Sequence, residues 1–259
     1  MNIGIFQQDI SRHLLLEEKL RKVENILIEN HDLNLLLLPE LFLSSYTTED
    51  YIKKITFNEI HLFQKEILKL SNQYSCAIAY GYPELEKDLR FNSLSIVKSG
   101  KQVFNHRKTV LPPSVMEKNL FSLGTNLSLF ELDGVKCSAL ICYEFEFPEL
   151  VRKLAKAGVQ LILIPTALSE EFKFVSQEML KTRAFENQVV LAYANYCGIL
   201  DGQNFCGQSA IVNEKGEDLI REDNTEKLIK YNVKFEDQSQ RRERLPYFKD
   251  IIKLEIEDR

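Results

Sequence analysis

Residues 135–165 read VKCSALICYEFEFPELVRKLAKAGVQLILIP, and this stretch predicts a strand, a helix and a second strand in succession. The first apolar run stops at Cys142. The helix can begin at Pro148, because a missing N–H costs little in a first turn, and Gly158 is typical of a helix C-cap. The apolar run at 159–165 has the length of a strand buried on both faces. The stretch therefore predicts a helix that links two strands and covers one face of a sheet.

The same alternation of strands and helices continues along the rest of the chain. Apolar residues at three-to-four-residue spacing predict amphipathic helices at about 16–27 and 57–70. Turns at Gly100 and at Asp133-Gly134 join strands into hairpins. A further helix is predicted at 170–188, a further hairpin at 207–220, and further strands at 2–8, 33–40, 76–81, 93–97, 102–108, 127–132, 189–195 and 227–233. Strands joined both by helices and by hairpins indicate mixed sheets, so we expect an α/β fold of two helix-covered layers.

The length and composition are those of a single globular domain. The chain has 259 residues, of which 44% are hydrophobic, and this is enough to bury a substantial core. No linker or repeat divides it, and we expect one domain over residues 1–259. Residues 235–259 form a highly charged tail that also carries the apolar segments LPYF and IIKLEI. We expect this tail to pack on a partner subunit.

The charge and the cysteines argue against several classes of protein. A net charge of −5 argues against nucleic-acid binding. No apolar stretch approaches the ~18 residues of a membrane span, and the N-terminal segment lacks the basic start and apolar core of a signal peptide. Five cysteines without a CxxC pair indicate reduced thiols and a cytoplasmic protein. The four scattered histidines form no zinc motif, and we expect neither a metal nor a cofactor.

Cys142 is the first of three residues that stand where a predicted strand leaves the sheet. A thiol in a strand-to-helix turn can project from the sheet edge, where neighbouring backbone N–H groups can bind an anion. The alternative is a buried cysteine that acts as a small hydrophobe. On composition alone, the buried hydrophobe is the more frequent case.

Glu40 and Lys108 are the other two residues of this kind. Glu40 follows four leucines and Pro39, so its carboxylate lies close to the core, where desolvation raises the pKa towards that of a working base. Lys108 ends the strand at 102–108. Each of them, taken alone, can also be a solvated charge at a strand end. Together with a thiol they form a catalytic set of a nucleophile, its base and a donor for an oxyanion.

A cysteine–histidine pair is the competing arrangement. His106 is two residues before Lys108 and would face the same way on a strand, so it stays a candidate base. The other histidines, His13, His31 and His61, stand in no local catalytic signature. No GxSxG, GxGxxG or GxxxxGK[ST] occurs, and the serine-hydrolase, Rossmann and P-loop classes therefore have no motif in this chain.

The chain resembles the nitrilase (carbon–nitrogen hydrolase) superfamily, in its amidase-like branch. The resemblance rests on LLLPELFLSSY, NHRKTVLPP and LICYEFEFPEL, which match the glutamate, lysine and cysteine motifs of that family in the same order. Weaker matches follow in ILIPTAL, RAFENQVVLAYAN and FCGQSAIVNEKGE, so the similarity covers nearly the whole chain. It implies a four-layer α-β-β-α sandwich of two mixed sheets covered by helices. It also implies assembly as a homodimer or a higher homo-oligomer.

The resemblance implies the roles of the catalytic residues as well. Cys142 corresponds to the nucleophile, Glu40 to the general base and acid, and Lys108 to the oxyanion donor. The backbone N–H of Tyr143 would be the second oxyanion donor. Glu117 corresponds, in a looser match, to a further active-site glutamate that many members have.

Three further residues are expected to bind the substrate. Tyr46 corresponds to a tyrosine often found in the pocket, and Thr166 stands where the family lines the substrate site. Glu144 replaces the aspartate that amidase-like members often have two residues after the cysteine. Tyr143 stands where dedicated nitrilases tend to have tryptophan, a residue absent from this chain, and this argues against a nitrile substrate.

We therefore expect a cysteine-dependent hydrolase that cleaves the non-peptide C–N bond of a small linear carboxamide to an acid and ammonia, through a thioester. Hydrolysis of an N-carbamoyl amine or amino acid is the first alternative, and a nitrilase the second. A non-catalytic binding or scaffold protein on the same fold is the alternative from a different class. The expected partner is thus a small amide or carbamoyl molecule, with no nucleic acid and no membrane.

Overall fold

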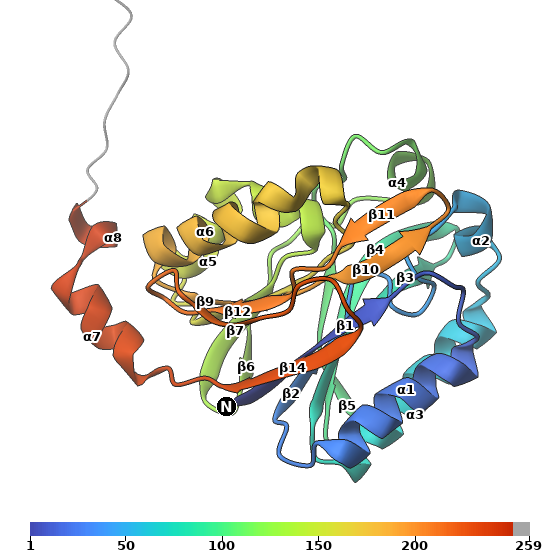
Figure 1. The fold of residues 1–259 in the computed structure, drawn as a ribbon, viewed down its shortest axis with the longest axis horizontal. Coiled ribbons are helices and arrows are strands. Elements are labelled where there is room, and N and C mark those ends of the chain that lie inside the picture. Colours follow the sequence, from blue (N-terminus) through green and yellow to red (C-terminus); the bar gives the residue numbers. More distant parts are fainter. Residues whose placement is uncertain (251–259) are drawn as a thin grey trace, which may run out of the picture.

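The computed structural model describes residues 1–250, and their strands form two β-sheets that pack face to face (Figure 1). The first sheet is mixed, because β1 is parallel to β2 and β10 but antiparallel to β14, while β3, β4 and β5 form an antiparallel meander. Its strand order is β11 (Gln203–Cys206), β10 (Tyr196–Leu200), β1 (Asn2–Asp9), β2 (Leu35–Leu37), β3 (Ala77–Glu86), β4 (Leu89–Lys98) and β5 (Lys101–Arg107), with β14 (Lys227–Asn232) also paired to β1.

The second sheet is mixed too. Its three central strands are parallel, and an antiparallel strand flanks them on each side. The strand order is β13 (Asp218–Arg221), β12 (Ala210–Val212), β9 (Val190–Ala194), β8 (Leu161–Pro165), β7 (Val135–Ala139) and β6 (Phe130–Leu132). The predicted strand–helix–strand unit therefore connects two neighbouring strands of this sheet, β7 and β8.

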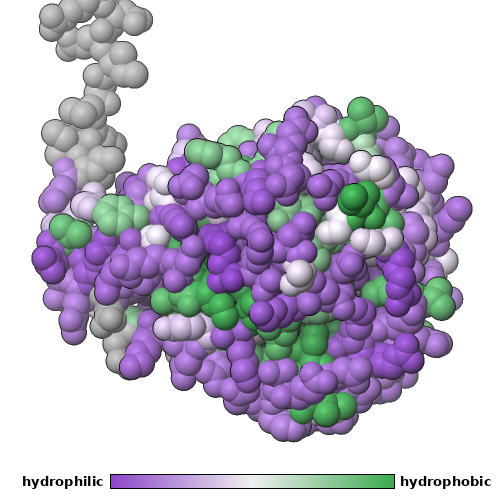
Figure 2. All heavy atoms as spheres, viewed as in Figure 1, coloured by the Kyte–Doolittle hydropathy of each residue, from purple (hydrophilic) through white to green (hydrophobic). Residues whose placement is uncertain are grey.

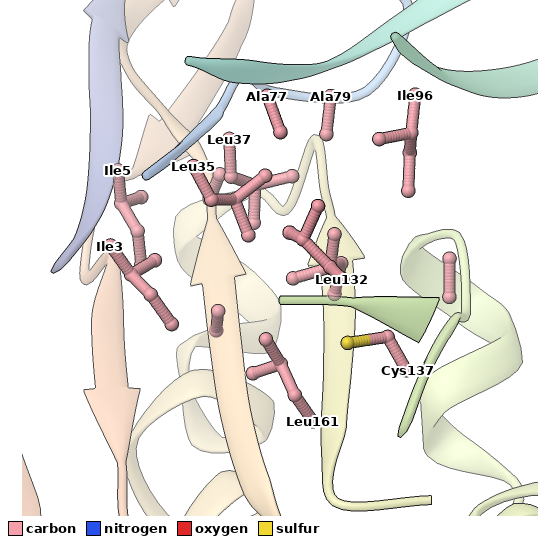
Figure 3. Close-up of a cluster of buried hydrophobic side chains, with 14 of the residues drawn as sticks. Ile3, Ile5, Leu35, Leu37, Ala77, Ala79, Ile96, Leu132, Cys137 and Leu161 are labelled. Atoms are coloured by element: carbon pink, nitrogen blue, oxygen red, sulfur yellow. The ribbon is translucent and has the colours of Figure 1, made fainter. Parts of the chain in front are cut away.

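The core between the sheets is built from alternate residues of the strands, because successive side chains of a strand point to opposite faces. Figure 3 shows side chains of the first sheet facing those of the second. The fully buried members include Ile3, Ile5, Leu35, Leu37, Ala77 and Ala79 from the first sheet and Cys137 and Leu161 from the second. Cys137 is thus a cysteine that acts as a core hydrophobe.

Helices cover the outer face of each sheet (Figure 1). Phe63 of the first pair of helices packs with Ile78 of β3, and Leu154 of the second pair packs with Ile162 of β8. The first pair consists of α1 (Leu16–Glu29) and α3 (Phe57–Gln73), and the second of α5 (Pro148–Lys156) and α6 (Leu180–Asn187). The predicted α-β-β-α sandwich is confirmed.

The segment before α6 departs from the single helix predicted at 170–188. It contains a 3₁₀ turn at Glu170–Phe172 and a π-helical turn at Val175–Met179, and the α-helix begins only at Leu180. The segment is nonetheless helical from Glu170 to Asn187, and Ser169, directly before it, forms a β-bridge with Phe205 of β11.

The C-terminal segment packs in part on its own chain. α7 (Glu236–Arg244) and α8 (Tyr247–Asp250) follow β14, and the amide of Gln238 donates to the carbonyl of Gln160 at 2.8 Å. Residues 251–259 of the predicted tail lie outside the described residues. Packing of the tail on a partner subunit therefore stays a prediction.

The surface drawn in Figure 2 is mostly hydrophilic, and its apolar side chains form patches among polar ones. Phe172 and Phe174, before α6, are among the exposed aromatic residues of the molecule. Within residues 1–250, no helix combines the length and the apolar character that crossing a membrane requires.

Candidate active site

The three predicted catalytic residues follow three different strands and come together at one edge of the sandwich. Glu40 follows β2, Lys108 follows β5, and Cys142 opens the 3₁₀ helix Cys142–Glu146 after β7. β2 and β5 run in the same direction within the first sheet, so their carboxyl ends lie at the same edge. Cys142 and Glu117 border the same cavity, and Glu117 contacts the Lys108 ammonium at 2.9 Å, which brings the thiol from the second sheet to this group.

The Lys108 ammonium links two carboxylates. Its Nζ atom donates to Oε1 of Glu40 at 2.7 Å and to Oε1 and Oε2 of Glu117 at 2.9 and 3.0 Å, and the side chain is fully buried. Burial alone would lower the pKa of Lys108, but the negative charges of Glu117 and Glu40 outweigh it and raise the pKa above its ordinary value. Lys108 is therefore a cation at neutral pH, held in place by two acids.

Glu40 uses its two carboxylate oxygens differently. Oε1 accepts hydrogen bonds from Lys108 Nζ and from Asn92 Nδ2, each at 2.7 Å. Oε2 is buried and has no hydrogen-bond partner among the described residues. Burial is the main cause of a raised pKa of Glu40; Lys108 opposes the rise and the charge of Glu117 adds to it. A carboxylate with a raised pKa and an unbonded oxygen is suited to accept and return a proton.

The backbone around Glu40 is fixed by close packing. The hydroxyl of Tyr196 in β10 donates to the carbonyl of Glu40 at 2.9 Å, and Leu41 has a φ of 50°. A Cβ atom at Gly81 of β3 would lie 2.2 Å from the backbone nitrogen of Leu41, so only glycine allows β3 to pass this close. Strand β10, next to β1, and strand β3, next to β2, thus set the position of the Glu40 carboxylate.

Cys142 has a left-handed backbone conformation, with a φ of 48°, at the first residue of the 3₁₀ helix. Such conformations are costly for non-glycine residues and cluster at functional sites. Burial, followed by the negative charge of Glu40, raises the pKa of the thiol well above its ordinary value, whereas Lys108 and a hydrogen bond from the Ala167 backbone act to lower it. The resting sulfur therefore carries its proton and needs a base to become a nucleophile.

A cavity of about 650 Å³ opens beside these residues. Cys142 and Glu117 border it, whereas Glu40 and Lys108 lie behind its surface and are fully buried. The lining is rich in apolar and aromatic side chains and contains two further acids. The apolar and aromatic members include Tyr46, Pro112, Pro113, Met116, Leu168, Phe172 and Leu200, and the acids are Glu146 and Asp201.

Glu117 connects the cavity to the buried ammonium. It lies in α4 (Val115–Leu120), a helix that begins after Ser114, whose hydroxyl accepts from the Glu117 N–H at 3.4 Å. The hydroxyl of Tyr46 donates to Glu117 Oε1 at 2.9 Å. Tyr46 therefore reaches the catalytic group through Glu117, and both side chains face the cavity.

Of the residues predicted to contact the substrate, Tyr46 and Tyr143 border the cavity, and Thr166 and Glu144 do not. The side chain of Thr166 is buried and its hydroxyl donates to the carbonyl of Ile164 at 3.3 Å. The carbonyl of Thr166 accepts from the Glu40 N–H at 3.4 Å. The geometry thus places Thr166 behind the cavity, where it supports Glu40.

Glu144 is fully buried and its carboxylate is saturated with hydrogen bonds. Oε1 accepts from the N–H and the hydroxyl of Thr109 at 2.8 and 2.6 Å, and Oε2 accepts from the N–H of Ile141 at 2.6 Å and contacts His106 Nε2 at 2.9 Å. Thr109 is the neighbour of Lys108, and Ile141 is the neighbour of Cys142. Glu144 therefore joins the loop that contains Lys108 to the loop that contains Cys142, and its hydrogen-bonding capacity is used within the protein.

His106 faces Glu144 and not the thiol. Its ring is buried, pairs with the Glu144 carboxylate and stacks on Phe104 of β5. The alternative of a cysteine–histidine pair has no geometric support, since Nε2 of His106 is engaged with Glu144.

Sequence patterns did not reveal Asn92, Glu146 or Asp201. Asn92 lies in β4 and reaches Glu40 only through the pairing of β4 with β3 and of β3 with β2. Asp201 lies in the turn between β10 and β11, and its side chain accepts a hydrogen bond from the Thr47 hydroxyl. Only Glu146 had a signal in the sequence, namely the run of acids directly after Cys142.

A family model described as carbon-nitrogen hydrolase matches residues 2–243. The chain belongs to this family. A relative from Pseudomonas protegens, described as "Hydrolase in pqqF 5'region", is 36% identical over 233 residues, which is 88% of this chain and 81% of that protein. The 2-oxoglutaramate amidase of Bacillus subtilis is 28% identical over 243 residues, or 91% of this chain and 92% of the relative.

Solved structures agree with this family assignment. An amidase from Nesterenkonia sp. AN1, in a variant with its cysteine replaced by alanine and in complex with butyramide, superposes with a TM-score of 0.85. It is 27% identical and the match covers 95% of each chain. The predicted family, the sandwich fold and the class of enzyme, a carbon–nitrogen hydrolase resembling amidases, are confirmed.

Proposed function

We propose that this carbon–nitrogen hydrolase converts a small linear carboxamide to an acid and ammonia through a thioester on Cys142. The observation that carries the proposal is the Lys108 ammonium held between Glu40 and Glu117, with an unbonded Glu40 oxygen behind a cavity that Cys142 borders. This arrangement supplies a base, a nucleophile and a fixed positive charge at one place.

In the first step, Oε2 of Glu40 accepts the thiol proton, and the sulfur of Cys142 attacks the amide carbonyl carbon. A C–S bond forms and the π electrons of the carbonyl move to its oxygen. The ammonium of Lys108 and the backbone N–H of Tyr143 donate to this oxyanion. Loss of one such donor typically raises the barrier by about 2.7–4 kcal/mol.

In the second step, Glu40 returns the proton to the amide nitrogen, the C–N bond breaks and ammonia leaves a thioester. Water then enters, Glu40 accepts one of its protons, and the hydroxide oxygen adds to the thioester carbonyl. When the C–S bond breaks, the sulfur recovers a proton from Glu40 and the acid is released. Each cycle consumes one water and leaves the enzyme unchanged.

Glu117 has a supporting role in this scheme. Both of its oxygens accept from Lys108, and the Tyr46 hydroxyl holds one of them. Glu117 therefore keeps the ammonium directed at the reacting carbonyl while Glu40 exchanges its proton. Burial and then the charge of Glu117 raise the pKa of Tyr46 well above its ordinary value, so this hydroxyl stays protonated as a donor.

The relatives support an amide as the group that is cleaved, and they do not bear on the end group that this cavity accepts. One relative is named for its action on 2-oxoglutaramate, and the structurally similar Nesterenkonia amidase was solved with butyramide. An N-carbamoyl amine or a nitrile could form the same kind of covalent intermediate, and both belong in the substrate panel as rival groups.

The test is ammonia release from a panel of small amides, N-carbamoyl compounds and nitriles. We expect turnover of at least one aliphatic amide and its loss in Cys142→Ala. Cys197→Ala is the matched control, because Cys197 is a buried cysteine of β10 outside the cavity lining. Full activity of Cys142→Ala, or no turnover of any amide, would refute the proposal.

A further inference from the structure

The active-site cavity is acidic around its catalytic centre. Besides the catalytic Glu117, its lining contains Glu146 and Asp201. Glu146 is the last residue of the 3₁₀ helix that begins with Cys142, and Asp201 lies in the turn between β10 and β11. The two acids therefore come from different sheets and face the same space as the nucleophile.

Neither acid forms an ion pair in the described part of the chain, although the charge of Lys108 acts from a greater distance on the pKa of Glu146, which burial raises. Asp201 accepts a hydrogen bond from the Thr47 hydroxyl, and no ion pair involves the carboxylate of Glu146 or of Asp201. Lining residues that carry a negative charge without a counter-ion favour a ligand that brings the positive charge itself.

The nearest cations are already engaged. Lys108 is bound by two catalytic carboxylates and lies behind the cavity surface. Arg183 pairs with Glu186 at 3.0 Å and donates to the backbone carbonyl of Glu146 at 3.4 Å, but it does not line the cavity. Among residues 1–250, the cavity lining includes no lysine, arginine or histidine, so a substrate carboxylate would find no fixed cation from this part of the chain.

Much of the remaining cavity lining is hydrocarbon. Leu168, Phe172 and Leu200 line it together with Pro112 and Met116. Such a surface accepts the methylene chain of a linear substrate but offers no compensation for a desolvated charge. The charged groups of the lining thus decide which end group a bound amide can carry.

We propose that this cavity selects carboxamides whose far end is an amine or a neutral group and rejects those that end in a carboxylate. The inference rests on the proposed function, because it takes the amide carbonyl to lie at Cys142. The inference also distinguishes between the two kinds of N-carbamoyl substrate. An N-carbamoyl diamine has the favoured cationic end, whereas an N-carbamoyl amino acid carries the rejected carboxylate.

The first test compares three amides of matched length and different end groups: γ-aminobutyramide, valeramide and succinamate. We expect kcat/KM to fall in that order, with at least about tenfold between the cationic and the anionic amide, which corresponds to about 1.4 kcal/mol. Equal values, or a preference for succinamate, would overturn the inference while leaving amide hydrolysis itself in place.

The second test removes the acids. Glu146→Gln and Asp201→Asn should each lower the ratio of kcat/KM for γ-aminobutyramide to that for succinamate, and the double variant should lower it further. The ratio cancels any general loss of activity. Glu171→Gln is the matched control, because Glu171 is an exposed acid next to Phe172 but is not part of the lining, and its ratio should stay at the wild-type value. An unchanged ratio in the double variant would contradict the inference.

A binding experiment separates this inference from the proposed function. Calorimetric titration of Cys142→Ala with the same three amides measures the charge preference without turnover. Tighter binding of γ-aminobutyramide than of succinamate, by about tenfold or more, supports an acidic selection site even if the chemistry differs from the proposal. Equal or tighter binding of succinamate would refute it even if amides are hydrolysed.

Discussion

Glu40 and Glu144 are two fully buried glutamates at the same edge of the sandwich, and they differ in how their oxygens are satisfied. Glu144 accepts from Thr109, Ile141 and His106 through both oxygens. Burial alone would raise its pKa, but the hydrogen bond and charge of His106 and the further donors outweigh burial and lower it. In Glu40 one oxygen has two donors and the other has none among the described residues, and burial raises the pKa.

This difference in hydrogen bonding distinguishes a carboxylate that stabilises the fold from one that can exchange a proton. Donors that fill both oxygens stabilise the ion and make protonation costly. A buried carboxylate oxygen without a hydrogen-bond donor lowers the stability of the fold. Such an oxygen is typical of functional sites, where the carboxylate has to accept a proton. Glu144 thus fixes the neighbours of Cys142 and Lys108, while Glu40 keeps one oxygen that can accept a proton.

The largest effect should come from Glu40→Gln, which keeps the shape of the side chain and removes the base. We expect ammonia release to fall by about 10²–10⁴-fold. Thermal unfolding should show a folded protein, because Lys108 keeps its contact with Glu117. A loss of activity below tenfold in a folded Glu40→Gln variant would show that another group accepts the thiol proton.

Glu144→Gln, in contrast to Glu40→Gln, should lower mainly the stability of the protein and have a smaller effect on its activity. The amide offers one acceptor oxygen where the carboxylate has two, and buried donors that lose their partner cost about 1–3 kcal/mol each. We expect a destabilisation of about 2–4 kcal/mol in denaturant unfolding, and a loss in kcat of about tenfold, since a displaced loop misplaces the catalytic groups. Glu144→Asp, which keeps both carboxylate oxygens, should restore part of the stability and part of kcat. If Glu144→Gln were as stable as wild type, the structural role assigned to Glu144 would be wrong.

The pH dependence should separate the two carboxylates. Glu40 must be ionised to act, and its pKa is raised from 4.5, so the acidic limb of kcat/KM should lie above pH 4.5. The pKa of Glu144 is lowered from 4.5, so its stabilising effect is complete above that value and is lost as pH falls through the folded pKa. Acidification should therefore reduce activity before it reduces the stability difference between wild type and Glu144→Gln. Loss of activity and of the stability difference at the same pH would contradict the assignment of a raised pKa to Glu40 and a lowered pKa to Glu144.

The last prediction concerns a second contrast, between two buried lysines. Lys108 has two carboxylate partners, whereas Lys19 donates to the carbonyls of Phe42 and Leu43, each at 2.8 Å, and burial lowers its pKa to about 7. The unfolded chain binds the proton more tightly, so Lys19 should make stability rise with pH between about 7 and 10.5. Lys19→Met should reduce that slope in denaturant unfolding. An identical slope in the variant would mean that Lys19 keeps an ordinary pKa.

The sequence predicts those residues of the site whose positions depend only on the strand that directly precedes them. Glu40, Lys108 and Cys142 stand at the ends of recognisable strands. Strands joined by helices and hairpins predict mixed sheets covered by helices, and the family resemblance implies the four-layer sandwich. The partners of these residues depend on which strands become neighbours. Asn92 reaches Glu40 across the first sheet, and Glu144 joins loops from both sheets. No spacing in the sequence encodes such contacts, and the assignment of Glu144 to the substrate therefore did not anticipate its saturated carboxylate.

The most direct test of the account is the identification of the covalent intermediate. Wild type and Glu40→Gln are mixed with an amide substrate, quenched in acid on the millisecond scale, and examined by intact-mass and peptide mass spectrometry. The account predicts an acyl group on Cys142 in wild type and its near absence in Glu40→Gln at the same times. Ammonia release without acylation of Cys142, or equally fast acylation in Glu40→Gln, would contradict it.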